Sequence, residues 1–228
     1  MQGIAIADRA YQKAVRFAHD RTQSRDLAGS AGPVAIINHP DVKRMLLTMR
    51  AHVEGARALA YVAAAASDAA HHATDASVQA QNQAVYEYLV PVIKGFSTEM
   101  SIDMASLGVQ VHGGMGYIEE TGAAQYLRDA RILTIYEGTT AIQANDLVGR
   151  KTLRDKGAVA RSLCDQIAIT EQDLAAHDND DCNAMLDALR QGRLALEKTI
   201  DFLVANGKIE PKAVYAGAVN YLKLAGVV

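Results

Sequence analysis

Two long runs of apolar residues, spaced three and four positions apart, constrain the fold of this sequence more than any other feature. That spacing places every member of a run on one face of an α-helix, and such a face must be buried. The chain contains only 4 prolines, and its abundant alanine, leucine and glutamine favour helix. Pro91 lies within the second run and predicts a bend rather than a helix end. The runs comprise Val42, Met45, Leu46, Met49, Val53, Ala56, Leu59 and Ala63, and Val85, Leu89, Val92, Phe96, Met100, Met104, Leu107 and Val111.

Shorter helices are predicted on both sides of these runs. The first covers about residues 3–22, with Ile4, Tyr11, Val15 and Ala18 on one side. Others are expected over 123–131, from near Thr140, through the leucines of 186–203, and after 205–212. Thr140 and Gln143 have the spacing of a capping box, in which side chains satisfy the free amides of a helix start.

Three segments lack this periodicity and are predicted to be irregular. They are 23–40, which is rich in glycine and proline, 112–122, and the acidic stretch 169–185. Weak strand patterns occur only at 34–37 and 132–136. The sequence therefore predicts an all-α, antiparallel up-and-down helical bundle over residues 1–155, with a partial helical tail over 156–228 as a C-terminal appendix.

Composition excludes several functional classes. A net charge of -3 offers no concentrated basic surface for nucleic acid. No apolar run reaches the length of a membrane span, and the first residues do not have the pattern of a secretory signal. Cys164 and Cys182 do not form a C-x-x-C pair, and two cysteines fit a reducing compartment. We therefore expect a cytoplasmic protein that binds no nucleic acid.

Gly113, Gly114 and Gly116 form the densest glycine cluster in the chain. A dinucleotide-binding fingerprint would require a glycine at position 119, where this chain has Glu119, and a preceding strand. Two interpretations remain open. The glycines form a tight turn between helices, or they let the backbone approach a phosphate group closely.

Glu137 is the single acidic residue between the apolar segment 132–136 and a predicted helix start. It is either a solvated side chain or a general base. Partial burial would raise the pKa of a glutamate and make it a better base near neutral pH. The amides of Thr139 and Thr140, at the helix start, suit an oxygen-rich ligand.

Asp68 and His71 have a spacing that is faintly similar to that of carboxylate-bridged metal bundles. Such bundles need Glu-x-x-His motifs on two helices and glutamates on the others, which this sequence does not contain. We therefore expect a solvated helix face here and no metal site.

The segment 110–143, QVHGGMGYIEETGAAQYLRDARILTIYEGTTAIQ, strongly resembles the C-terminal helical domain of acyl-CoA dehydrogenases. Residues 3–25, GIAIADRAYQKAVRFAHDRTQSR, resemble the first helix of that domain and its arginine-bearing end. The tail after residue 155 is similar to that of a longer branch of the family, which includes 3-methylmercaptopropionyl-CoA dehydrogenase-like members.

The resemblance implies FAD-dependent oxidation of an acyl-CoA thioester to its 2-enoyl product, with Glu137 as the catalytic base that removes the alpha proton. It further implies an acyl-CoA substrate, electron-transfer flavoprotein or a similar acceptor, and a homo-oligomer. Tyr136 and Gly138 match substrate-binding positions. The positions that match FAD contacts are Arg21, Gln23, Gln110, Gly113, Gly114 and Thr139.

Members of the family carry two further domains before this one, so we expect the chain to be the C-terminal part of an enzyme and inactive alone. The alternative is a non-catalytic helical module, derived from the same family, that serves oligomerisation or interaction.

Overall fold

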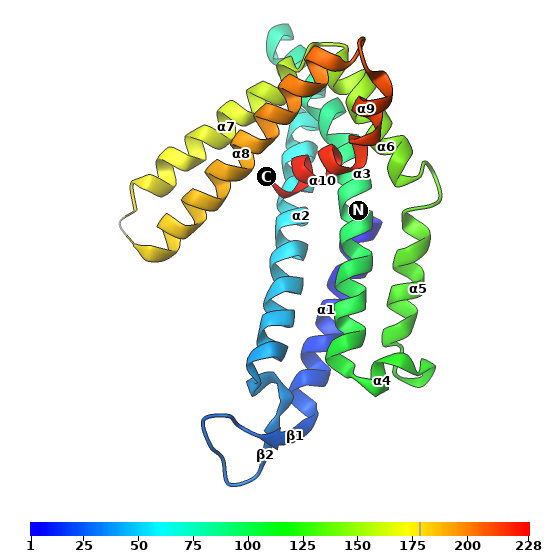
Figure 1. Cartoon of the computed structure of the whole chain (residues 1–228), viewed down its shortest axis with the longest axis vertical. Coiled ribbons are helices and arrows are strands. Elements are labelled where there is room, and N and C mark those ends of the chain that lie inside the picture. Colours follow the sequence, from blue (N-terminus) through cyan, green and yellow to red (C-terminus); the bar gives the residue numbers. More distant parts are fainter. Residues whose placement is uncertain (178) are drawn as a thin grey trace. The chain divides into compact units, whose positions relative to one another are not determined.

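The computed structural model describes residues 1–177 and 179–228, and helices make up most of it (Figure 1). The prediction of an all-α fold with a helical C-terminal tail is confirmed, with one small two-stranded sheet added. The elements, in chain order, are α1 Gln2–Asp20, β1 Thr22–Arg25, β2 Pro33–Ala35, η1 Ile36–Asn38, α2 Pro40–His72, α3 Ala76–His112, α4 Gly114–Tyr117, η2 Glu119–Thr121, α5 Ala123–Leu133, α6 Thr140–Asp146, the π-helix η3 Leu147–Leu153, α7 Ala158–Ala175, α8 Asp180–Asn206, α9 Pro211–Ala216 and α10 Ala218–Val227.

The chain forms two compact units, and the two longest helices contribute to both. Unit 1 consists of 1–60 and 97–137, and unit 2 of 61–96 and 138–228. The predicted division at residue 155 remains a prediction, because it concerns domains rather than these units. Within the described residues, no helix is both long enough and apolar enough to cross a membrane.

Unit 1 is built on a stripe of alanines along α1. Ala7, Ala10, Ala14 and Ala18 are almost fully buried, whereas Tyr11 and Val15, which the sequence placed on the buried side, are only half-buried. The small side chains allow close helix packing. A Cβ on Gly3 would lie 2.4 Å from the carbonyl oxygen of Ser97, so α1 and α3 are nearly in backbone contact there. Bulkier residues of α2 and α3, such as Met49 and Met104, fill the remaining core.

The two predicted apolar runs are confirmed as the buried faces of α2 and α3. Met45, Met49 and Val53 are buried on α2, and Val92 and Met100 are buried on α3. Helix α3 does not end at Pro91, as the sequence predicted, and the bend expected there stays a prediction.

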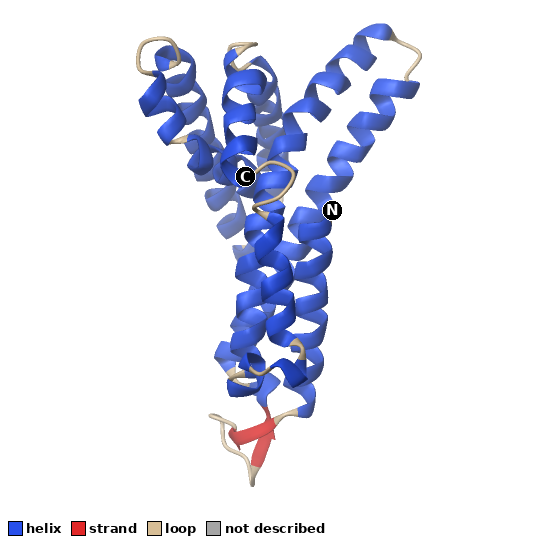
Figure 2. Cartoon of the chain, turned by 90° about the vertical axis from the view of Figure 1, so that its right-hand side faces the viewer, coloured by secondary structure: helices blue, strands red, loops and turns tan. Residues whose placement is uncertain are grey.

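The predicted irregular segment 23–40 contains local order that the sequence barely indicated. Strands β1 and β2 pair antiparallel, with Thr22 opposite Ala35, and they form the small sheet visible in Figure 2. The weak strand pattern at 34–37 was correct only for its first half, since Ile36 begins η1. The pattern at 132–136 was wrong, because α5 runs to Leu133 and a turn follows.

Unit 2 contains the antiparallel pair α7 and α8 and the short terminal helices α9 and α10 (Figure 1). The prediction of an irregular stretch over 169–185 was wrong for most of its length. Helix α7 continues to Ala175 and α8 begins at Asp180, because the Asn179 side chain caps α8 by accepting a hydrogen bond from the Cys182 amide. Asp178, within that stretch, lies outside the described residues. Glu171 on α7 pairs with Arg193 on α8, at 2.5 Å from its Nε.

A second correction concerns the start of α6. The N-cap is Thr139, not Thr140, and the Thr139 hydroxyl oxygen accepts a hydrogen bond from the Ile142 amide at 3.4 Å. Thr140 is already the first helical residue and is buried. The cap therefore forms one residue earlier than the Thr140/Gln143 spacing suggested, because the burial of Thr140 leaves Thr139 at the exposed position.

Candidate functional site

A cavity of about 450 Å³ in unit 1 brings together residues from the two segments that carry the sequence resemblance, 3–25 and 110–143. It lies where the end of α1, strand β1 and η1 meet the end of α3 and the start of α4. Five of the six predicted FAD contacts line it. The lining residues are Phe17, Arg21, Gln23, Ile36, Gln110, Val111, His112, Gly113, Gly114 and Met115.

The end of α1 positions Arg21 and Gln23. Arg21 is the C-cap of α1 and has extended backbone angles, so the chain leaves the helix directly into β1. The Arg21 carbonyl accepts a hydrogen bond from the Ile36 amide at 2.8 Å, and His39 Nε2 lies 2.7 Å from the Gln23 carbonyl oxygen. The side chains of Arg21 and Gln23 are exposed and line the cavity. The small sheet therefore holds this segment beside the bundle.

The glycines at the end of α3 have separate roles. Gly113 has a φ of 59°, a left-handed conformation that favours glycine, and it ends α3 after His112. A Cβ on Gly116 would lie 2.3 Å from the Val109 carbonyl oxygen, so Gly116 is required for packing. A Cβ on Gly114 would meet nothing within 4 Å. The turn between helices is therefore confirmed at Gly113, and the close approach of a phosphate group to the backbone stays a prediction.

An aromatic pair forms one wall of the cavity and was not anticipated from the sequence. Phe17 stacks on His112 with ring centroids 4.3 Å apart. His112 is buried, and its Nδ1 donates a hydrogen bond to the Gly108 carbonyl oxygen, 2.7 Å away. Burial lowers the pKa of His112, and the nearby Lys13 lowers it further. The ring is therefore a neutral stacking surface near pH 7.

The donors in this cavity suit an anion with several oxygens. Arg21 is the only arginine or lysine among the lining residues, and within the described chain its guanidinium donates a 3.4 Å hydrogen bond to Gln23 Oε1. Most of its guanidinium donors are therefore available. The amides of Gln23 and Gln110 add further donors.

Glu137 lies in a different part of unit 1, in the turn after α5, and does not line this cavity. The sequence left Glu137 open as a solvated side chain or a general base, and its side chain is exposed in this chain. The backbone conformation of residues 137 and 138 explains this exposure. Glu137 has a φ of 51° and Gly138 a φ of 90°, so two successive left-handed residues form an open turn instead of continuing α5. Left-handed backbone at a non-glycine residue is costly and is concentrated at functional sites.

Tyr136 and Thr139 flank this turn. The Tyr136 hydroxyl donates a hydrogen bond to Gln2 Oε1 in α1, which ties the turn to the first helix within unit 1. Thr139, the sixth predicted FAD contact, and Gly138 belong to unit 2. Because the Thr139 hydroxyl oxygen accepts the cap hydrogen bond, its proton is free to be donated elsewhere.

The Asp68 and His71 pair remains an exposed helix face. His71 donates from Nδ1 to the Ser67 carbonyl oxygen of its own helix, at 2.7 Å. No group of three or more metal-ligating side chains occurs among the residues that the structure describes.

Comparison with known proteins decides the family. The family described as acyl-CoA dehydrogenase, C-terminal domain, matches residues 1–152. This chain belongs to the acyl-CoA dehydrogenase family. It is 52% identical to 3-methylmercaptopropionyl-CoA dehydrogenase of Ruegeria pomeroyi over 227 residues, which are 99% of this chain and 38% of that protein. It is 38% identical to the broad-specificity linear acyl-CoA dehydrogenase FadE5 of Mycobacterium tuberculosis, over 73% of this chain and 28% of that protein.

Solved structures support the fold of the whole chain. Caenorhabditis elegans ACDH-11, in complex with C11-CoA, superposes with a TM-score of 0.71 at 18% identity, over 98% of this chain and 36% of that one. At that identity the likeness concerns the fold alone. The chain spans about 38% of the Ruegeria protein's length, so it corresponds to the C-terminal part of a dehydrogenase and not to the whole.

Proposed function

We propose that this chain is the part of an FAD-dependent acyl-CoA dehydrogenase that carries the catalytic base and several flavin contacts. The reaction is the α,β-dehydrogenation of an acyl-CoA thioester to the 2-enoyl-CoA. The observation that supports this most directly is the unit 1 cavity, because residues 21, 23, 110, 113 and 114 meet there although up to 93 positions separate them.

The residues of the cavity fit the pyrophosphate of FAD. The Arg21 guanidinium can donate two parallel hydrogen bonds to phosphate oxygens, and Gln23 and Gln110 can donate to the others. Gly113 and Gly114 let the backbone approach closely, since Gly114 has open space where a side chain would be. When bound, the flavin would accept the hydride from the beta carbon of the substrate.

Glu137 would take the proton from the carbon alpha to the thioester carbonyl. In this role Tyr136 and Gly138 flank the reacting part of the substrate, and the left-handed turn at 137 and 138 directs the carboxylate away from α5. Thr139 keeps its hydroxyl proton as a donor toward the flavin, because the cap uses only its oxygen. A general base is most effective where water is excluded, so we propose that the bound substrate covers Glu137.

Relatives support the substrate class and the electron acceptor. The names of the Ruegeria and Mycobacterium proteins refer to acyl-CoA substrates, and we propose an acyl-CoA thioester for this chain. One relative is the caffeyl-CoA reductase-Etf complex subunit CarC of Acetobacterium woodii, 30% identical over 62% of this chain and 32% of that protein. We propose electron-transfer flavoprotein or a similar acceptor as the oxidant of the reduced flavin.

The proposal can be tested in a chimera in which this chain replaces the matching 38% of the Ruegeria dehydrogenase. The chimera should retain FAD, and Arg21→Gln should weaken FAD binding by about 10- to 100-fold, since hydrogen bonds to charged groups contribute about 1.5–3 kcal/mol. Arg25→Gln is the matched control, because Arg25 ends the strand that begins directly after Arg21 and does not line the cavity. Equal FAD binding in wild type and Arg21→Gln would refute the assignment of the cavity.

A second candidate function, self-association, is favoured by exposed apolar side chains along α4 and α5 in unit 1. Tyr117 is 84% exposed, and Met115, Ile118, Ile132 and Ile135 are also exposed. Such residues favour association with another surface, so we propose a homo-oligomer. Sedimentation of the isolated chain tests this directly: a monomer at all concentrations would contradict it, and oligomers without FAD binding would favour the non-catalytic module.

A further inference from the structure

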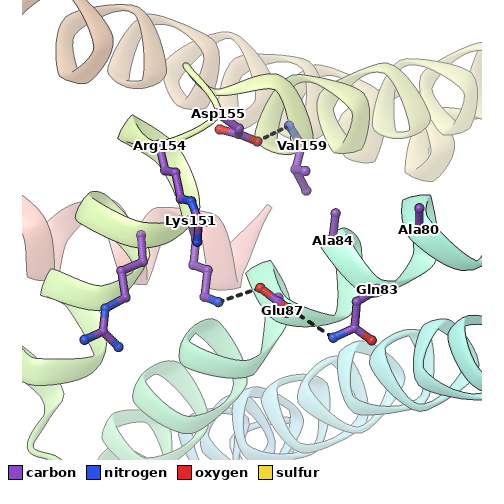
Figure 3. A pocket seen from close by; sticks show the side chains of 9 residues that line it. Ala80, Gln83, Ala84, Glu87, Lys151, Arg154, Asp155 and Val159 are labelled. Atoms are coloured by element: carbon purple, nitrogen blue, oxygen red, sulfur yellow. Dashed lines mark hydrogen bonds and ion pairs between the residues drawn. The ribbon is translucent and has the colours of Figure 1, made fainter.

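Unit 2 contains a separate cavity of about 540 Å³ that the proposed dehydrogenase chemistry does not use. One wall is the part of α3 within unit 2, and the other is formed by η3 and the segment that leads into α7 (Figure 3). The lining residues are Ala80, Gln83, Ala84, Glu87, Arg150, Lys151, Arg154, Asp155 and Val159.

Both carboxylates of this cavity have partners within the protein. Glu87 accepts a hydrogen bond from Lys151 Nζ at 2.9 Å and another from Gln83 at 3.0 Å. The hydrogen bond from Gln83 and then the contact with Lys151 lower the pKa of Glu87, so it is ionised near neutral pH. Asp155 accepts from two amides at the start of α7, those of Gly157 and Val159, each at 2.9 Å. The charge of Arg154 also lowers the pKa of Glu87, although less than the two direct contacts do.

Arg154 is the lining cation that no carboxylate contacts directly. It is exposed at the cavity and makes no hydrogen bond or ion pair with any residue that the structure describes, and it carries no dashed line in Figure 3. Arg150 is held only loosely, at 3.4 Å from Asp146, and its side chain is 81% exposed. The lining residues therefore present one guanidinium that makes no direct hydrogen bond and a second one that is held only loosely.

The local backbone and the opposite wall leave room for a ligand. Arg150 and Lys151 lie on the π-helix η3, a rare conformation that occurs frequently at functional sites. On the facing wall, Ala80 and Ala84 are small and apolar. A cavity with arginines on one side, and on the other a short apolar surface beside the hydrogen-bonded Glu87, suits an anion that is attached to a larger organic group.

We propose that this cavity binds a small molecule bearing a phosphate or diphosphate group. The planar fork of Arg154 would bind the phosphate oxygens in a bidentate manner, with Arg150 as a second donor. Ala80, Ala84 and Val159 would contact the organic part. Arginine suits phosphate recognition, whereas a solvated lysine acts only as a point charge.

Titration of the full chain with pyrophosphate, ADP and succinate tests the proposal, with calorimetry for affinity and ¹H–¹⁵N spectra for location. We expect saturable binding of pyrophosphate and ADP, with amide shifts concentrated in 83–87 and 150–159. Arg154→Gln should weaken this binding by about 10- to 100-fold, and Arg154→Lys should lie between the two because lysine lacks the fork. ADP should bind more tightly than pyrophosphate, because its organic part would contact the apolar wall, and equal affinities would overturn that part of the proposal.

Lys156→Gln is the matched control. Lys156 is two residues after Arg154 and carries the same charge, but its side chain does not line the cavity. Its affinity should stay within about 2-fold of wild type if long-range electrostatics contribute little. Equal weakening by Lys156→Gln and Arg154→Gln would overturn the proposal, as would succinate binding as tightly as pyrophosphate. Circular dichroism checks the fold of each variant, and for any that does not fold alone the titration is repeated in the chimera. Absence of saturable pyrophosphate binding there would also overturn it.

Discussion

Replacement of Tyr221 by phenylalanine should destabilise the protein more than its single lost hydroxyl suggests. Tyr221 on α10 lies at the centre of a buried chain of hydroxyls in unit 2. The Thr152 hydroxyl lies 2.9 Å from the Leu147 carbonyl oxygen and donates to it. It must therefore accept from Tyr221, 3.0 Å away, and Tyr221 in turn accepts from Tyr88 at 2.9 Å. Tyr88, Thr152 and Tyr221 are at most 3% exposed.

The direction of these hydroxyl hydrogen bonds decides how much stability each substitution costs. Tyr88→Phe removes one donor and leaves Tyr221 hydrogen-bonded to Thr152, so it should cost about 0.5–1.5 kcal/mol of the free energy of unfolding. Tyr221→Phe removes both hydrogen bonds and leaves the buried Tyr88 hydroxyl without an acceptor. Its cost should be about 2–4 kcal/mol, because an unsatisfied buried group alone costs about 1–3 kcal/mol.

The double variant gives the sharpest test. Adding Tyr88→Phe to Tyr221→Phe removes the unsatisfied hydroxyl, so the double variant should be more stable than Tyr221→Phe by about 1 kcal/mol. Urea unfolding followed by far-ultraviolet circular dichroism measures these values. Tyr215→Phe is the control, because Tyr215 is 39% exposed, and its effect should stay within about 0.5 kcal/mol. Additive costs in the double variant would refute the hydroxyl chain.

Three further results are expected. The hydrogen bond from Arg193 is the main cause that lowers the pKa of Glu171, so the stability that this carboxylate contributes is present above its unfolded pKa and is lost as pH falls through the lower folded value. Glu171→Gln should therefore flatten the acid side of a curve of Tm against pH, and an unchanged slope would contradict this. Gly116→Ala should lower the free energy of unfolding by about 1–3 kcal/mol, because the new Cβ would lie 2.3 Å from a carbonyl oxygen. Gly114→Ala, where the Cβ would point into open space, should change the free energy of unfolding by less than about 0.5 kcal/mol. Equal chemical-denaturation midpoints for the two variants would disprove the distinction. Glu137→Gly should raise the unfolding free energy by about 0.5–1 kcal/mol, because it relieves a left-handed backbone at a φ of 51°, and a loss of stability would show that the turn is not strained.

The sequence predicted the helices well where burial sets a periodic pattern. Met45, Met49 and Val53 recur at helical spacing and are buried on one face of α2. It did not predict the small sheet, because Thr22–Arg25 is exposed along its whole length and has no alternation to detect. The acidic stretch before Asp178 was misjudged, since Glu171 and its neighbours belong to a helix stabilised by ion pairs with α8 that no local pattern shows.

The residues of the candidate site were predicted only in part, because contacts between distant residues leave no local sequence pattern. The resemblance selected Arg21, Gln110 and Gly114, and the fold brings them to one cavity. The stacked Phe17 and His112 were missed, because a contact between residues so distant in sequence leaves no local signal. A histidine in the last turn of an apolar helix, just before a glycine end, could have drawn attention to that position.

Anaerobic reduction of the flavin in the chimera is the most direct test of Glu137 as the base. Mixed with an acyl-CoA in the absence of an electron acceptor, the wild-type chimera should lose its visible flavin absorbance. Glu137→Gln should slow this step by about 10²- to 10⁴-fold, the usual contribution of a general base, while FAD binding is unchanged. The matched control Glu120→Gln, an exposed glutamate of η2, should reduce the flavin at the wild-type rate. If Glu137→Gln reduced the flavin as fast as wild type, its carboxylate would not be the base.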